Sequence, residues 1–260
     1  SWLEIIGRYL VTKRDSKKQI SSVLFPRYHQ LDATRQLVKA VMAEGAGQKY
    51  LIQHSAGSGK TNSIAWTAHF LADLHDGQNN KVFSTVLVVS DRTVLDTQLQ
   101  EAIFDFERTA GVVATIKGES QSKSGELAKA LAGGKKIVVC TIQTFPFALT
   151  AVQELAATQG KRFAVIADEA HSSQTGEAAG KLKQVLSADE LKDLADGGEV
   201  AAEDILAAQM SARASQADST SAITYVAFTA TPKSKTLELF GRKPKPDQPA
   251  GPDNLPAPFH

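Results

Sequence analysis

The sequence His54-Ser55-Ala56-Gly57-Ser58-Gly59-Lys60-Thr61 lies between the apolar run 50–52 and the helical pattern 64–74 of this 260-residue chain. A glycine-rich stretch that follows a strand and opens a helix is typical of a phosphate-binding loop. Its glycines let consecutive N–H groups turn toward a phosphate, and the helix N-terminus adds positive potential. The full pattern has glycine at its first position, where this chain has His54. The alternative is a glycine-rich turn without a ligand, and the Lys-Thr pair at its end argues against it.

The residues of this loop predict how a nucleotide and its metal ion would be bound. Lys60 is expected to reach the β- and γ-phosphates, and the Thr61 hydroxyl is expected to bind Mg²⁺. The rest of the predicted phosphate cradle consists of Ser55, Ala56, Gly57, Ser58 and Gly59. The predicted ligands are therefore a nucleoside triphosphate and Mg²⁺.

Short apolar runs on both sides of the loop alternate with helical patterns. The runs are 50–52, 86–89, 137–139, 163–166 and 225–228, and the helical patterns include 30–44, 64–74 and 94–106. Each run is continuously apolar, which is typical of strands covered on both faces. The alternation predicts an α/β fold, with a parallel sheet and helices on both faces.

A second chemical signal is Val165-Ile166-Ala167-Asp168-Glu169-Ala170-His171, an apolar run that ends in two carboxylates. Asp168 is expected to hold Mg²⁺, and Glu169 is expected to orient and activate the attacking water. On its own, an Asp-Glu pair could equally be a solvated strand end. About 100 residues after a phosphate loop it favours nucleotide hydrolysis, because hydrolysis needs both halves of the site.

A third stretch, Phe228-Thr229-Ala230-Thr231-Pro232, follows another apolar run. Asp-Glu-Ala-His at 168–171 resembles the DEAH form of helicase motif II, and Thr-Ala-Thr at 229–231 resembles motif III. The order of the three stretches resembles superfamily 2 helicases and translocases, which implies a RecA-like P-loop NTPase domain. In that superfamily, residues matching His171, Thr229 and Thr231 couple the ATP site to nucleic-acid movement. The resemblance also implies that the motif III strand lies between the strands of the phosphate loop and motif II.

Upstream of the loop, Phe25-Pro26-Arg27-Tyr28-His29-Gln30 resembles the adenine-recognition motif of the same superfamily. An amide donates and accepts hydrogen bonds at once, so Gln30 is expected to bind the adenine edge. An aromatic side chain would stack on the base, and the sequence does not distinguish Phe25 from Tyr28 in this role. The predicted nucleotide is therefore ATP.

Two further stretches follow predicted strands and resemble superfamily motifs that hold one DNA strand. Ser90-Asp91-Arg92-Thr93-Val94-Leu95 resembles motif Ia, and Thr141-Ile142-Gln143-Thr144 resembles motif Ib. Hydroxyls, an arginine and a helix N-terminus bind phosphates without reading the base sequence. The expected DNA-contacting residues are Arg92, Thr93, Thr141 and Gln143, although ordinary helix capping is the alternative for residues such as Ser90 and Thr93.

Longer stretches at 168–177 and 227–241 resemble the R subunit of type I restriction-modification enzymes, as does the polar segment between them. The resemblance covers about 25–241. It implies ATP-driven translocation along double-stranded DNA before cleavage, with methyltransferase and specificity subunits as protein partners. It also implies a nuclease domain before the motor and a second RecA-like lobe after it, and the 260 residues show neither pattern.

The chain is expected to divide into three parts. Residues 1–24 form an N-terminal helix, to about residue 14, and a linker with a basic stretch at 13–18. Residues 25–241 form the ATP-binding lobe, with a polar excursion at about 172–221 and helices in it at 178–186 and 200–214. Residues 242–260 hold six of the nine prolines and are expected to be a linker toward the second lobe. Because the chain begins with Ser1 rather than Met, we expect it to be a piece of a longer polypeptide.

Composition sets the remaining expectations. The net charge of +1 neither requires nor excludes a nucleic-acid partner. The single cysteine, Cys140, lies in an apolar run and suits a reducing compartment. No apolar run is long enough to span a membrane, so a cytoplasmic protein is expected. Two alternatives stay open, namely another superfamily 2 helicase or chromatin-type translocase, and a lobe that binds nucleotide or DNA without catalysis.

Overall fold

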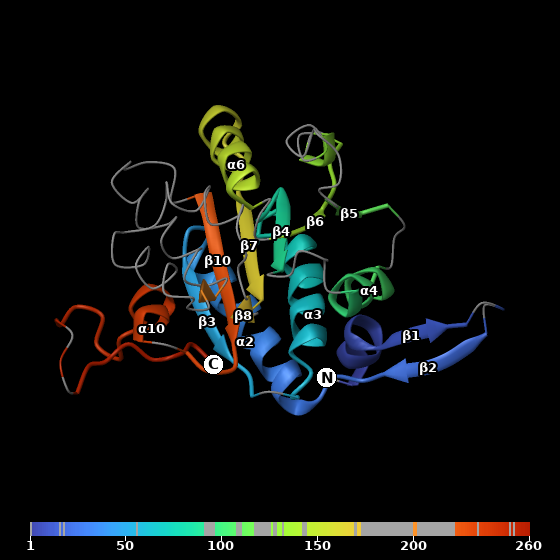
Figure 1. Cartoon of the computed structure of the whole chain (residues 1–260), viewed down its shortest axis with the longest axis horizontal. Helices are drawn as coiled ribbons and strands as arrows, with labels where there is room; N and C mark the ends of the chain where they lie inside the picture. The colour runs from blue at the N-terminus through green and yellow to red at the C-terminus, as the bar shows by residue number, and fades with distance from the viewer. Residues whose placement is uncertain are drawn as a thin grey trace.

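A six-stranded parallel sheet forms the centre of the domain (Figure 1). The computed structural model describes residues 2–15, 17, 19–55, 57–90, 97–107, 111–116, 126, 129–131, 133–141, 145–168, 171–172, 200–201, 222–232, 234–249, 251 and 253–260. The strands run in the order β3-β10-β7-β4-β6-β5. Their bounds are β3 (Lys49–Gln53), β4 (Thr85–Ser90), β5 (Val113–Thr115), β6 (Ile137–Thr141), β7 (Phe163–Asp168) and β10 (Ile223–Thr229).

The strand order confirms the predicted place of the motif III strand. β10 lies between β3, which leads into the phosphate loop, and β7, which ends in Asp168. The register pairs Thr229 with Gln53 and Phe228 with Asp168. Because all these pairs are parallel, the ends of β3, β10 and β7 meet at one edge of the sheet.

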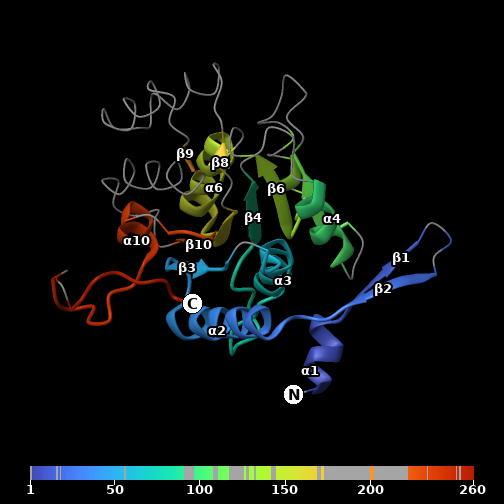
Figure 2. The ribbon, with the colours of Figure 1, turned by 60° about the horizontal axis from the view of Figure 1, so that its bottom comes forward.

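Helices cover both faces of the sheet, as the continuous apolar runs predicted (Figure 2). The helices α2 (Tyr28–Glu44), α3 (Lys60–Ala72) and α4 (Thr97–Asp105) contribute to one core cluster, and α6 (Phe145–Gln159) and α10 (Ser234–Phe240) to the other. Neighbouring strand residues divide between the clusters, so that Val86 and Val88 belong to one and Leu87 and Val89 to the other. This alternation explains why a buried strand with two covered faces needs an unbroken apolar sequence.

The N-terminal segment differs from its prediction. A short helix, α1 (Trp2–Glu4), continues as one π-helical turn, η1 (Ile5–Tyr9), and the expected helix stops there. Trp66 donates its indole N–H to the Tyr9 carbonyl over 3.0 Å, and the Tyr9 ring packs 4.6 Å from that of Phe70. Leu10 is extended, so the chain leaves the helix at a residue held by tertiary contacts.

A β-hairpin replaces the predicted linker. The strands β1 (Val11–Arg14) and β2 (Ile20–Leu24) pair antiparallel, and the basic stretch 13–18 includes the end of β1 and the turn. The hairpin projects away from the sheet (Figure 1). The β-branched residues Val11, Thr12, Ile20 and Val23 favour this pairing, and the 3.6-residue pattern of the preceding segment obscured it.

The polar excursion lies largely outside the described residues. Two short strands, β8 (His171–Ser172) and β9 (Val200–Ala201), pair antiparallel at its base. The helix expected at 178–186 and most of the one expected at 200–214 fall outside the described part of the chain. Val200 and Ala201 are extended instead of helical. No helix among the described residues is long and apolar enough to cross a lipid bilayer.

The proline-rich C-terminal segment folds back onto the sheet. The Phe259 N–H donates to the Leu51 carbonyl over 2.7 Å, and the Gln53 N–H donates to the His260 carbonyl over 2.7 Å. These bonds lie on the edge of β3 that does not face β10, and both views place the C-terminus beside β3 and α2 (Figures 1 and 2). The segment therefore covers an edge strand, which would otherwise present unpaired peptide groups.

Arg242 anchors the beginning of this segment. Its guanidinium donates two hydrogen bonds to the Glu44 carboxylate, over 2.8 and 2.7 Å, at the end of α2. The same group lies 4.5 Å from the centre of the Tyr50 ring and 5.0 Å from that of Phe259. A bidentate pair stacked on two aromatic rings positions an arginine far better than a single surface ion pair.

Replacing Arg242 with alanine should loosen this segment without unfolding the sheet. We expect faster amide exchange at Phe259 and Gln53, and a loss of about 1 kcal/mol in the free energy of unfolding. Hydrogen exchange read by mass spectrometry measures the first effect and urea unfolding the second. Lys243→Ala is the matched control, and equal exchange at Phe259 in both variants would contradict the anchoring role.

Candidate nucleotide-binding site

The three predicted chemical stretches converge at the carboxyl edge of the sheet. Lys60 is the first residue of α3, directly after the loop that leaves β3, and Asp168 is the last residue of β7. The Lys60 Nζ lies 3.2 Å from Oδ1 of Asp168. Residues 108 positions apart in the sequence therefore form one ion pair, at the edge where open parallel sheets bind ligands.

The loop has the backbone conformation that its glycines predicted. Gly57 has φ 74° and Gly59 has φ 84°, which lie in the left-handed region that favours glycine. Ser58 N–H donates to the Ser55 carbonyl over 3.1 Å and closes a tight turn. The helix then begins at Lys60, so the positive end of its dipole lies at the mouth of the loop.

Gln30 is bound to the phosphate loop in this structure. Its amide Nε2 donates to the Gly59 carbonyl over 2.9 Å, and its Oε1 accepts the Arg27 N–H over 2.8 Å. The side chain belongs to a residue that is only 3% exposed. A Cβ on Gly59 would stand 2.7 Å from Nε2, so any other residue there would displace the Gln30 amide, and the positive φ angle favours glycine in addition.

His54, at the first position of the loop, is buried among several elements. Its N–H donates to the Thr229 carbonyl over 2.8 Å, and its Nδ1 lies 3.3 Å from the Ser63 hydroxyl. The ring packs edge-on against Phe228, with 5.8 Å between ring centres. Burial lowers the pKa of His54 to about 4, and the charges of His29, His260 and Lys60 add to the effect. The imidazole is therefore neutral at physiological pH.

Two further histidines, His29 and His260, lie beside His54, and the sequence did not predict this. The ring centre of His29 is 5.2 Å from that of His54, and His29 Nε2 is 3.0 Å from the Ser58 carbonyl. His260 lies 6.4 Å from His54, ring centre to ring centre, and its Nε2 is 3.1 Å from Asp32 Oδ2. His29 precedes Gln30 in α2, so the prediction that Gln30 lies at the nucleotide site could have suggested that His29 lies there too. Nothing in the sequence connects His260 with this site, because only the folded-back segment brings it there.

The structure describes the positions of the three predicted coupling residues, Thr229, Thr231 and His171. Thr229 is completely buried at the end of β10, with its carbonyl bound to His54 and its Oγ1 accepting the Thr231 N–H over 3.3 Å. Thr231 is exposed. The backbone of His171 is in β8, directly after the stretch that carries the carboxylates.

Of the other predicted site residues, the structure describes some and not others. Thr141 ends β6 beside Ser90 of β4 and is 7% exposed. Thr61 follows Lys60 in the first turn of α3 and is half-buried. Four predicted site residues lie outside the described part of the chain, namely Glu169, Arg92, Thr93 and Gln143, and so does Ala56 of the loop.

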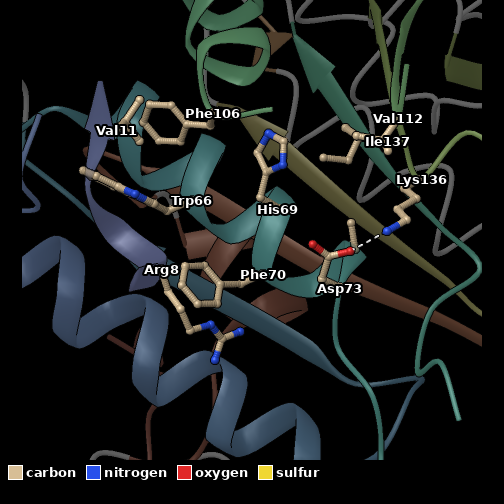
Figure 3. A pocket seen from close by; sticks show the side chains of 11 residues that line it. Arg8, Val11, Trp66, His69, Phe70, Asp73, Phe106, Val112, Lys136 and Ile137 are labelled. Atoms are coloured by element: carbon tan, nitrogen blue, oxygen red, sulfur yellow. Dashed lines mark hydrogen bonds and ion pairs between the residues drawn. The ribbon is translucent and has the colours of Figure 1, made fainter. Parts of the chain in front are cut away.

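A separate cavity of about 280 Å³ lies along the second half of α3, from Trp66 onward (Figure 3). Trp66, Phe70 and Phe106 form aromatic walls, and the ion pair between Asp73 and Lys136, 2.7 Å long, lies at its side. None of the predicted ATP-site residues lines it. The cavity is therefore distinct from the predicted nucleotide site.

The parallel sheet, the loop and the Lys60–Asp168 pair together define a RecA-like P-loop NTPase lobe of a superfamily 2 motor. The family model of the SWI2/SNF2 ATPase matches residues 29–192, more than half of the chain, and the match includes both residues of that pair. The chain belongs to the SWI2/SNF2 ATPase family.

Two larger proteins match parts of this chain. A Methanocaldococcus jannaschii protein, named as the type I restriction enzyme MjaVIIP endonuclease subunit, is 32% identical over 104 residues, which are 38% of this chain and 9% of the relative. The structure of a nuclease-deletion mutant of the Type ISP restriction-modification enzyme LlaGI, in complex with a DNA substrate mimic, matches with a TM-score of 0.44 and 14% identity. That match covers 81% of this chain and 18% of the LlaGI chain. The chain thus spans a small part of both.

The lowered pKa of His54 predicts a pH-dependent stability. The unfolded chain takes up a proton as the pH falls through about 6.5, whereas the folded chain resists protonation until about 4, so folding stability is lost on acidification. Between pH 7 and 5, we expect His54→Phe to lose about 1–2 kcal/mol less stability than the unsubstituted chain. Urea unfolding at both pH values measures this, with the exposed-histidine variant His75→Gln as control. An identical pH dependence in the unsubstituted chain and in His54→Phe would show that the pKa of His54 is not lowered by folding.

Proposed function

We propose that this chain is the first ATP-binding lobe of a DNA-translocating motor, in the R subunit of a type I restriction endonuclease. The Lys60–Asp168 pair carries the nucleotide part of this proposal, because it joins a phosphate-binding cation to a metal-binding carboxylate at 3.2 Å. The stretch of 32% identity to the Methanocaldococcus jannaschii endonuclease subunit supports the restriction part. ATP hydrolysis would then drive translocation along double-stranded DNA before cleavage elsewhere in the full protein.

Each site residue would have a separate role in ATP hydrolysis. Lys60 would bind the β- and γ-phosphates, and the loop N–H groups from Ser55 to Gly59 would cradle them. Thr61 and Asp168 offer a hydroxyl and a carboxylate, the oxygen ligands that Mg²⁺ prefers. When bound, Mg²⁺ neutralises phosphate charge. Glu169 would accept a proton from the attacking water.

Gln30 would recognise adenine while it stays bound to the loop. Its Oε1 uses one lone pair for the Arg27 N–H, and the second lone pair remains for an adenine amino group. The stacking partner would come from Tyr28 or Phe25, which are 81% and 50% exposed. A movement of Gln30 on binding the base would therefore act directly on Gly59, the residue before Lys60.

Arg92, Thr93, Thr141 and Gln143 would hold the phosphate backbone of DNA without reading its sequence. Thr229, Thr231 and His171 would couple that contact to the ATP site. For Thr229 the coupling path is short, because its carbonyl accepts the N–H of His54 in the phosphate loop. In the complete enzyme, methyltransferase and specificity subunits would select the DNA.

A SWI2/SNF2 motor with no restriction activity is the second candidate, because the family match does not depend on a nuclease. Such a motor would translocate on DNA as a helicase or chromatin-type translocase. The sequence of the complete natural polypeptide distinguishes the two. An Asp…Glu-x-Lys metal site before the motor supports the restriction enzyme, and its absence supports the alternative.

Lys60→Ala should abolish measurable ATP binding, because it removes the cation that contacts the phosphates. Titration of a fluorescent ATP analogue in the presence of Mg²⁺ measures the dissociation constant. Lys39→Ala, an exposed lysine on α2, is the matched control and should bind as the unsubstituted chain does. Unchanged affinity in Lys60→Ala would exclude the assigned phosphate loop.

The 260-residue chain by itself should bind ATP but hydrolyse it very slowly, with little stimulation by DNA. In the motors it resembles, a second lobe supplies an arginine to the γ-phosphate, and such arginines accelerate hydrolysis by roughly 10³–10⁵-fold. Arg242, the sole arginine after motif III, is engaged by Glu44 and two aromatic rings. A phosphate-release assay at saturating Mg·ATP with duplex DNA tests this. Turnover of several per second would show that the chain completes its own site.

A further inference from the structure

The phosphate loop is held at its first residue by a side chain, where the usual pattern has glycine. His54 is 3% exposed, and it contacts three elements of the fold, namely β10, α2 and α3. Its backbone N–H is bound to Thr229 at the end of β10. Its ring meets Phe228 of β10 and His29 of α2, and its Nδ1 faces Ser63 of α3.

The contact with Ser63 closes the loop on itself. Ser63 lies in the first turn of α3, three residues after Lys60, so the 3.3 Å contact joins the first residue of the loop to the helix after it. Between these points Gly57 and Gly59 give the backbone unusual freedom. A side-chain contact across the base of such a loop restricts its shapes.

The other side of the loop is held from α2. His29 Nε2 lies 3.0 Å from the Ser58 carbonyl, and Gln30 donates to the Gly59 carbonyl. His29 also packs on the His54 ring. His54 Nε2 is buried without a hydrogen-bond partner among the described residues, so polarity alone does not explain a histidine here. The shape of the ring and its Nδ1 contact are what the surroundings use.

We propose that His54 is a positioning residue that fixes the phosphate loop in the shape that binds the phosphates of ATP. The proposal rests on the function assigned above and adds a residue to it. His54 would not touch the nucleotide. It acts by holding the start of the loop to α3, α2 and β10, so that less ordering is needed when the phosphates bind.

The test compares His54→Gly, which restores the usual loop sequence, with His54→Asn, whose amide can replace Nδ1 beside Ser63. The matched control is His69→Asn, since His69 is a histidine of α3, the helix that carries Ser63, and its Nε2 lies 2.8 Å from the Ile103 carbonyl, away from the loop. Each variant of the 260-residue chain is titrated with a fluorescent ATP analogue and Mg²⁺, and its stability is measured by urea unfolding.

We expect His54→Gly to weaken ATP binding about tenfold, equivalent to about 1.4 kcal/mol, and His54→Asn to recover part of that loss. His69→Asn should lower stability without changing the affinity. If His54→Gly lowers stability but binds ATP as tightly as the unsubstituted chain, the role is merely structural and the proposal is wrong. If the unsubstituted chain binds no ATP, the proposed function fails first, and this inference fails with it.

Discussion

The parallel pairing of β3, β10 and β7 is the constraint on which the site depends. Each strand delivers one chemical group to the same edge, because parallel neighbours end on the same side of a sheet. With β10 in the middle, the carbonyl of Thr229 reaches the first residue of the phosphate loop, and Asp168 stands opposite Phe228. A change in this order would separate Lys60 from Asp168, whatever the loop sequence.

The electrostatics of the edge follow from that geometry. A lysine and an aspartate 3.2 Å apart neutralise each other, while the start of α3 adds positive potential. His54 lies beside this pair and stays neutral, because burial opposes its protonation. The positive potential that remains at the loop thus comes from the start of α3, and the buried His54 side chain behind the loop contributes shape and no charge of its own.

The hydrogen-bonding groups of β3 are used on both sides, and this links distant parts of the chain. β10 pairs along one edge and the Phe259–His260 backbone along the other. Arg242 holds the segment against Glu44 and Tyr50, at the opposite end of β3 from the loop. A short strand therefore connects the C-terminal segment to the phosphate loop, with Gln53 as the last paired residue before His54.

Local sequence patterns determined the fold class and the nucleotide-binding loop. Continuous apolar runs specify strands buried on two faces. Gly57 and Gly59 supply the left-handed φ angles that the turn of the phosphate loop requires. Tertiary structure decided what depends on contacts between remote residues. Trp66 binds the Tyr9 carbonyl where the N-terminal helix ends, and Gln30 donates its amide to Gly59. Arg242 anchors the beginning of the proline-rich tail, whose end covers the edge strand β3. Periodicity records only which face of an element is apolar, so it cannot say which distant partner will satisfy a polar group there.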